Sequence, residues 1–172
     1  ASKRLQPGGV FLQWLQAYEI DAQTVRTVYA TLASVFPWVE TYQTMSGDLL
    51  LLATFTPIVY DVPTLRARLA EPIYRQALGL AWGTEGLDGF LARSVASPAP
   101  ARDIAGAVGP HLNTDDRTLI EFDFARSVGR AAGFSIESLR ALAVARDAGR
   151  PELRGGPVDW ERVEDQRLAM LA

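Results

Sequence analysis

The sequence predicts an α/β fold, and three features near its start predict it. The tripeptide PGG at positions 7–9 precedes an apolar run, Val10–Leu15, as in a turn that leads into a buried strand. Apolar residues then recur every three or four positions between Val25 and Phe36, which is typical of one face of a helix. The short segment Met45–Asp48 contains Gly and separates two further strand-like stretches, which predicts a hairpin.

The first strand, Val10–Leu15, is expected to lie in the interior of a sheet. The run is apolar at positions that face both sides of a strand, and only Gln13 interrupts it. Strands covered on both faces are typical of the middle of α/β sheets. The following helix is expected to begin after Asp21, which can cap it, and to end at Pro37.

The next two strands are expected over Trp38–Thr44 and Leu49–Phe55. Because so short a loop joins them, they should be antiparallel neighbours. The helix before them implies a right-handed parallel crossover from the first strand. The order strand, helix, strand, hairpin, strand therefore predicts a mostly parallel sheet that ends in an antiparallel hairpin.

The remainder of the chain is expected to be mainly helical. We expect a sheet unit over residues 1–60, a helical region over 61–134 and terminal helices over 135–172. The elements expected there are helices at Pro63–Leu80, Glu85–Val95 and Asp159–Leu171, a helix capped by Ser135, one helical turn at Asp103–Val108, a short strand at Leu119–Phe124 and a linker at Arg150–Pro157.

Composition narrows the class of protein. The chain has 172 residues, of which 48% are hydrophobic, so it can bury a core. Its net charge of −3 argues against binding to nucleic acid, which favours a basic surface. It contains no Cys, which excludes disulfides and Cys-based zinc sites. No apolar run is long enough to predict a membrane span within these residues, so we expect a cytoplasmic segment, whatever anchors a larger parent protein.

Two segments resemble a known family. The stretch RLQPGGVFLQWLQAYEIDAQTVRTVYATLASVFPWVETYQTMSGDLLLLAT is similar to the second half of the polyamine aminopropyltransferases, the spermidine/spermine synthase family. The segment LNTDDRTLIEF, residues 112–122, resembles the LNTDDRPxxEF element of bacterial spermidine synthase-like proteins, with Thr118 where that pattern has Pro. This resemblance implies a Rossmann-like sheet of the class I methyltransferase type.

The resemblance also implies an activity and a missing half. Family members transfer an aminopropyl group from decarboxylated S-adenosylmethionine to a polyamine. They place the Gly-rich loop, the ribose-binding acid and the catalytic aspartate before the strand expected at Val10–Leu15, and none of these is in this sequence. Gly8 and Gly9 precede a strand, not a helix, so they do not form a dinucleotide fingerprint. We therefore expect the C-terminal part of a larger bacterial enzyme, which by itself binds neither S-adenosylmethionine nor its decarboxylated form and whose main partner is the remainder of its parent chain.

Four residues are candidates for contact with substrate. Tyr18 follows the first strand, and an aromatic at about this position lines the polyamine site in the family; an aromatic ring also attracts an alkylammonium. Gln13 is a polar group in a buried run, so it needs a partner, which we expect to be backbone in preference to substrate. Asp115 and Asp116 can hold an amine or a divalent ion, or they can stabilise a turn. No catalytic residue and no metal ligand is assigned.

Two alternatives from other classes remain open. The chain can be a non-catalytic interaction module that self-associates through an exposed strand edge or its final helix. The third reading, a small hydrolase or metal enzyme, would rely on His111 together with the acidic pair.

Overall fold

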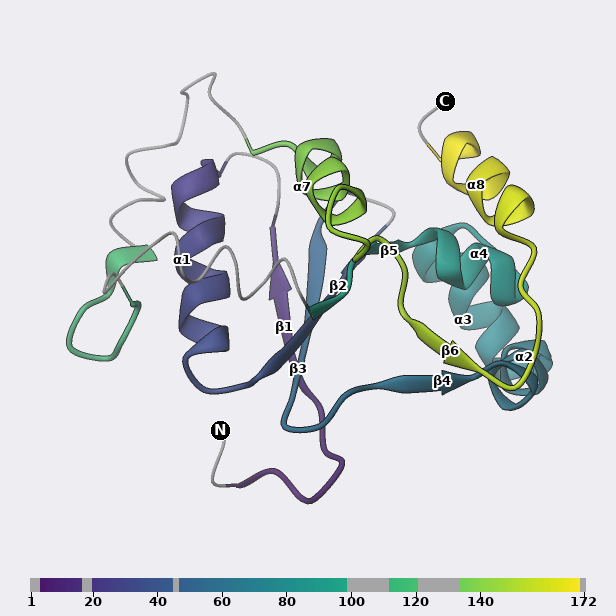
Figure 1. Cartoon of the computed structure of the whole chain (residues 1–172), viewed down its shortest axis with the longest axis horizontal. Helices are drawn as coiled ribbons and strands as arrows, with labels where there is room; N and C mark the ends of the chain where they lie inside the picture. Colours follow the sequence, from purple (N-terminus) through teal and green to yellow (C-terminus); the bar gives the residue numbers. More distant parts are fainter. Residues whose placement is uncertain (1–3, 17–19, 45–46, 99–111, 121–133, 171–172) are drawn as a thin grey trace.

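A four-stranded sheet forms the centre of the molecule. The computed structural model describes residues 4–16, 20–44, 47–98, 112–120 and 134–170. The sheet contains β1 (Phe11–Leu15), β2 (Trp38–Gln43), β3 (Leu49–Thr54) and β5 (Ser94–Ala96), in the order β1-β3-β2-β5. Helices pack around it, so the fold is mixed α/β, as the sequence predicts (Figure 1).

The strand directions follow from two short-range signals. β2 and β3 are antiparallel neighbours, which confirms the predicted hairpin, and Gly47 has the positive φ of +86° that its turn uses. β3 is also antiparallel to β1, so β1 and β2 run in the same direction with β3 between them. Every neighbouring pair in this sheet is antiparallel, so the described strands do not form the mostly parallel sheet that the sequence predicts. The helix α1 (Ala22–Ala33) makes the crossover from β1 to β2.

The prediction that β1 is covered on both faces is wrong. β1 is an edge strand of the sheet. Its inward residues, Phe11 and Leu15, pack against the core, whereas Leu12 and Trp14 on the other face are 54% and 51% exposed. The prediction was based on the apolar residues that face both sides of this strand. Among the described residues, none covers the face that carries Leu12 and Trp14.

One face of the sheet is covered by α1. Asp21 caps this helix as predicted, because its side chain accepts a hydrogen bond from the Thr24 N–H at 2.7 Å. The helix buries Val25, Val28, Tyr29 and Leu32 against the strands. The helix α7 (Ile136–Val144), capped by Ser135 as predicted, adds Leu139 and Ala143 to the same core and packs beside β5.

The remaining elements form a helical group next to the sheet. It contains α2 (Val62–Ala70), α3 (Pro72–Trp82), α4 (Gly86–Ala92) and α8 (Trp160–Ala169). The parallel strands β4 (Val59–Asp61) and β6 (Glu152–Arg154) lie between this group and the sheet (Figure 1). The group has its own apolar core, which includes Val62, Leu69, Leu87, Leu91 and Val163.

The single helix predicted over Pro63–Leu80 is wrong. Glu71 has ψ of 139°, outside the helical region, and it separates α2 from α3. Pro72 explains the break, because a proline ring disfavours helical geometry at the residue before it. Ile73 would share a face with Leu65 and Leu69 in one continuous helix, but it is exposed in α3.

Three other predictions are corrected by short strands and a short helical stretch. Ser94 and Val95 were predicted to end a helix but belong to β5, and the predicted linker at 150–157 contains β6. Leu119 and Ile120 are helical where a strand was predicted, and the rest of that segment and the turn at 103–108 lie outside the described residues. α8 confirms the final helix, with Asp159 as its cap.

Candidate functional site

Gln13 lies on the inward face of the edge strand β1. It is half-buried, and its side-chain amide donates a hydrogen bond to the Trp14 carbonyl at 2.7 Å. This confirms the expected backbone partner. The Trp14 indole N–H in turn donates to Asp48 Oδ2 at 3.1 Å, which ties the end of β1 to the start of β3. Tyr18, the aromatic candidate after β1, lies outside the described residues.

Asp115 and Asp116 form the tip of a tight turn. The backbone N–H and carbonyl of Thr114 are paired with those of Arg117 at 3.0 and 2.9 Å, and both aspartates between them are exposed. The Asn113 side chain accepts from the Ile120 N–H at 3.2 Å and so closes the loop. The acidic pair therefore lies in a turn, which is one of the two roles that the sequence allowed for it.

The structure does not bring the acidic pair to Gln13. The Asn113 N–H donates to Thr31 Oγ1 at 2.9 Å, which attaches the turn to the C-terminal half of α1. Figure 1 shows segment 112–120 on one side of α1 and β1 on the other. Gln13 is the middle residue of β1, so α1 lies between the two candidates.

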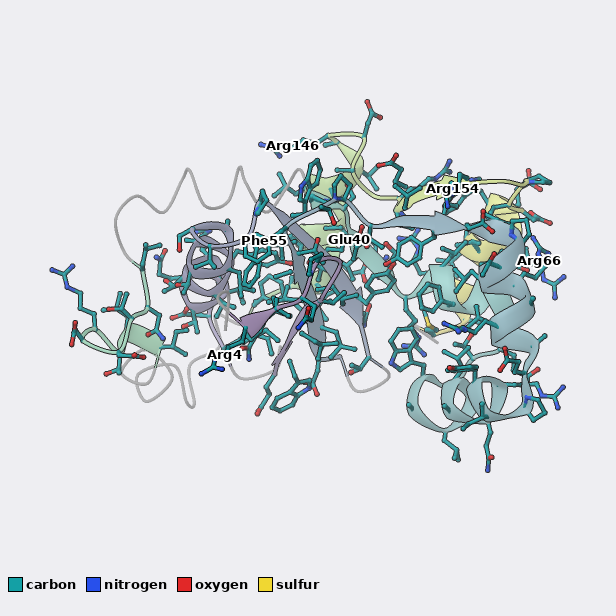
Figure 2. All side chains as sticks on the ribbon, turned by 90° about the horizontal axis from the view of Figure 1, so that it is seen from below. Arg4, Glu40, Phe55, Arg66, Arg146 and Arg154 are labelled. Carbon is teal, nitrogen blue, oxygen red and sulfur yellow. The ribbon has the colours of Figure 1, made fainter. Side chains whose placement is uncertain are left out.

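A buried carboxyl that sequence reasoning missed lies on β2. Glu40 is only 3% exposed, and Figure 2 shows it in the middle of the molecule, between the sheet and the helical group. The Tyr60 hydroxyl, from β4, donates to Glu40 Oε2 at 2.8 Å. The Tyr42 hydroxyl donates to that of Tyr60 at 2.9 Å. The Glu40 carboxyl thus accepts a hydrogen bond from Tyr60, and the Tyr60 hydroxyl accepts one from Tyr42.

Burial changes the acidity of this cluster. Removal from water is the main cause that raises the pKa of Glu40 from its ordinary value to about 7, and the negative charge of Glu152 raises it further. The hydrogen bond from Tyr60 acts in the opposite direction. Burial also raises the pKa of Tyr60 and of Tyr42, so both hydroxyls stay protonated donors.

Glu40 lines a cavity of about 230 Å³. Trp38 and Pro57 lie on its walls together with Arg150 and Glu152. A carboxyl that titrates near neutral pH can accept or release a proton there, and a pair of acids beside an aromatic ring suits a cationic group. The sequence signal was weak but present: strand alternation places Glu40 on the same face as Trp38 and Tyr42, which leaves a lone acid among aromatic residues.

Some other kinds of site receive no support from the described residues. Within the described ranges, no three acidic or His side chains converge in a way that could hold a metal ion. His111, the basis of the hydrolase and metal hypothesis, lies outside those ranges. None of the helices in the part of the chain that the structure describes combines the length and apolar character that crossing a bilayer requires.

Comparison with known proteins adds no relative. A scan against protein-family models, a search of curated proteins and a search of solved structures each find nothing that matches this chain.

Proposed function

We propose that this chain forms the end of the sheet and the substrate-side region of a spermidine synthase-like aminopropyltransferase, with a sheet of the class I methyltransferase type. The strand directions carry the proposal. β1, α1 and β2 make a crossover between strands that run in the same direction, and β3 reverses after a hairpin. This is the sheet ending that the resemblance implies, and it occurs on the residues that carry the resemblance.

The free edge of β1 also supports the proposal. Among the described residues, β1 pairs only with β3, so its other edge is open to a further strand. In a larger sheet that edge would continue into the nucleoside-binding half. The Gly-rich loop and ribose-binding acid of that half are not in this sequence, so no reaction step is assigned to residues of this chain.

Ligand binding and activity test the proposal. We expect this chain to show no micromolar binding of decarboxylated S-adenosylmethionine in isothermal titration. The full product of the reading frame that encodes it should bind the same compound and transfer its aminopropyl group to a polyamine. In that product, Tyr18→Ala should raise the KM for the polyamine about tenfold, as expected for the loss of one cation–π contact.

Tyr74→Ala is the matched control, because Tyr74 is an exposed tyrosine on α3. It should leave KM unchanged. A full product that neither binds the nucleoside nor transfers an aminopropyl or methyl group would contradict the proposal, and so would clear micromolar binding by this chain alone.

A second candidate is a non-catalytic module that self-associates. Exposed apolar side chains in and just before β1, whose other edge is open, favour this candidate. They belong to Val10, Leu12 and Trp14. Sedimentation velocity at increasing concentration should then show a dimer in the wild-type protein and less dimer in Trp14→Ser. A monomer at every concentration would exclude this candidate.

A further inference from the structure

A second cavity lies between α4, α7 and α8, away from the strand edge discussed above. It has a volume of about 460 Å³, a size typical of small-molecule sites. Val144, Val163 and Trp160 give it apolar walls. Three guanidinium groups, those of Arg140, Arg150 and Arg167, line it together with the carboxylates of Asp147 and Glu164, so positive charge exceeds negative charge at its surface.

Arg140, on α7, is the buried member of the three. It is 5% exposed, and it donates through Nη1 to the Ser94 carbonyl and through Nη2 to Gln43 Oε1 at 3.1 Å. Its Nε is buried and has no hydrogen-bond partner among the described residues. The nearest carboxylate oxygen given for it is Glu137 Oε1, 3.9 Å from Nε, beyond hydrogen-bond distance. Burial leaves Nε with almost no accessible surface, so a ligand in the cavity would meet the charge of this guanidinium and not its Nε–H.

Arg167, on α8, lines the same cavity as Arg140. It forms an ion pair with Glu164, one turn earlier on the same helix. Burial is the main cause that lowers the pKa of Arg140 to about 10, and the positive charge of Arg167 lowers it further. Arg150 is held in place by the Trp160 ring, with its guanidinium carbon 4.1 Å from the ring centre. An anion between Arg140 and Arg167 would offset the repulsion between these two positive charges.

We propose that this cavity binds a small organic anion, whose phosphate or carboxylate group lies against Arg167, beside the buried charge of Arg140, and whose apolar part contacts Val144, Val163 and Trp160. Guanidinium groups suit both kinds of oxyanion, because their N–H groups point in fixed directions that match the oxygens. The apolar walls distinguish such a ligand from a bare inorganic ion. The site is independent of the proposed aminopropyl transfer.

Titration with phenyl phosphate and with benzoate tests the site in the intact chain, and the two arms separate the two oxyanions. Isothermal titration should detect saturable binding of at least one probe. Binding should weaken about tenfold or more in Arg167→Gln, because a charged hydrogen bond is lost. Arg162→Gln is the matched control: Arg162 also lies on α8, but it pairs with Asp88 at 3.2 Å and does not line the cavity. It should keep the wild-type affinity.

NMR of the wild-type protein gives a readout that does not depend on whether a variant folds. The indole N–H signal of Trp160 should shift in a saturable way as the aromatic ring of the bound probe packs against this side chain. The proposal is overturned if neither probe binds at millimolar concentration. It is equally overturned if a probe binds without moving that signal, or with the same affinity in a folded Arg167→Gln protein.

Discussion

Glu40→Gln is expected to stabilise the protein by about 3 kcal/mol at pH 8, because it removes a carboxylate that the folded state must ionise in a buried place. The pKa of Glu40 rises from its ordinary value of 4.5 to about 7, mainly through burial. The Gln side chain has nearly the same shape and keeps an oxygen that can accept the hydrogen bond from Tyr60.

The pH dependence has a definite sign. Below about pH 4.5, Glu40 is protonated in both the folded and the unfolded chain, so it adds no pH dependence. Between about pH 4.5 and 7, the unfolded chain releases the proton while the folded chain retains it. The free energy of unfolding of the wild-type protein should therefore fall over this range, relative to Glu40→Gln, and the difference should be constant above it.

Urea unfolding at a series of pH values between 4 and 8 measures this difference. Glu152→Gln is the control, because Glu152 is an exposed acid on β6 that influences Glu40 only through its charge. It should leave most of the pH dependence in place. If the free energy of unfolding depends on pH in the same way in the wild-type protein and in Glu40→Gln, the pKa of Glu40 is not raised in the folded state.

Leu51→Ala is expected to cost about 3 kcal/mol of unfolding free energy, whereas Leu12→Ala should cost less than about 1 kcal/mol. Leu51 is fully buried in β3, the strand between β1 and β2, and its removal leaves a cavity in the core. Leu12 faces outward from β1 and is more than half exposed, so little buried surface is lost with it.

Thermal or urea unfolding of the two variants compares these costs. The pair is informative because both residues are leucines in paired strands of one sheet, so differences in strand preference cancel. Similar costs for the two variants would contradict the edge position of β1 and favour an interior strand covered on both faces.

Local signals in the sequence predicted the elements that depend on neighbouring residues. The cap at Asp21 and the spacing from Val25 to Phe36 predicted α1, and the turn that contains Gly47 predicted the hairpin of β2 and β3. Ser135 and Asp159 predicted where α7 and α8 begin. Pro72 carried the signal for the break between α2 and α3, but the apolar spacing continues across it and is that of one long helix.

The candidate site was predictable only in part. The sequence predicted that the acidic pair lies in or near a turn and that Gln13 has a backbone partner, but it did not predict their separation by α1. It gave only a weak reason to select Glu40, which is a lone acid among aromatic residues on one face of a strand, and none to select Arg140. Their environments are made by Tyr60, Ser94 and Gln43, which lie 20, 46 and 97 positions away along the chain.

The sequence by itself determined the α/β class, the principal helices and the hairpin, because caps, turns and apolar spacing act over a few residues. Only the tertiary structure decided that β1 is an edge strand, that Ser94–Ala96 and Glu152–Arg154 are strands, and that Glu40 and Arg140 are buried. Three-residue strands exist only through their partners. Burial of a charged side chain likewise depends on which distant segments pack over it, and the spacing of residues along the chain does not predict which segments those are.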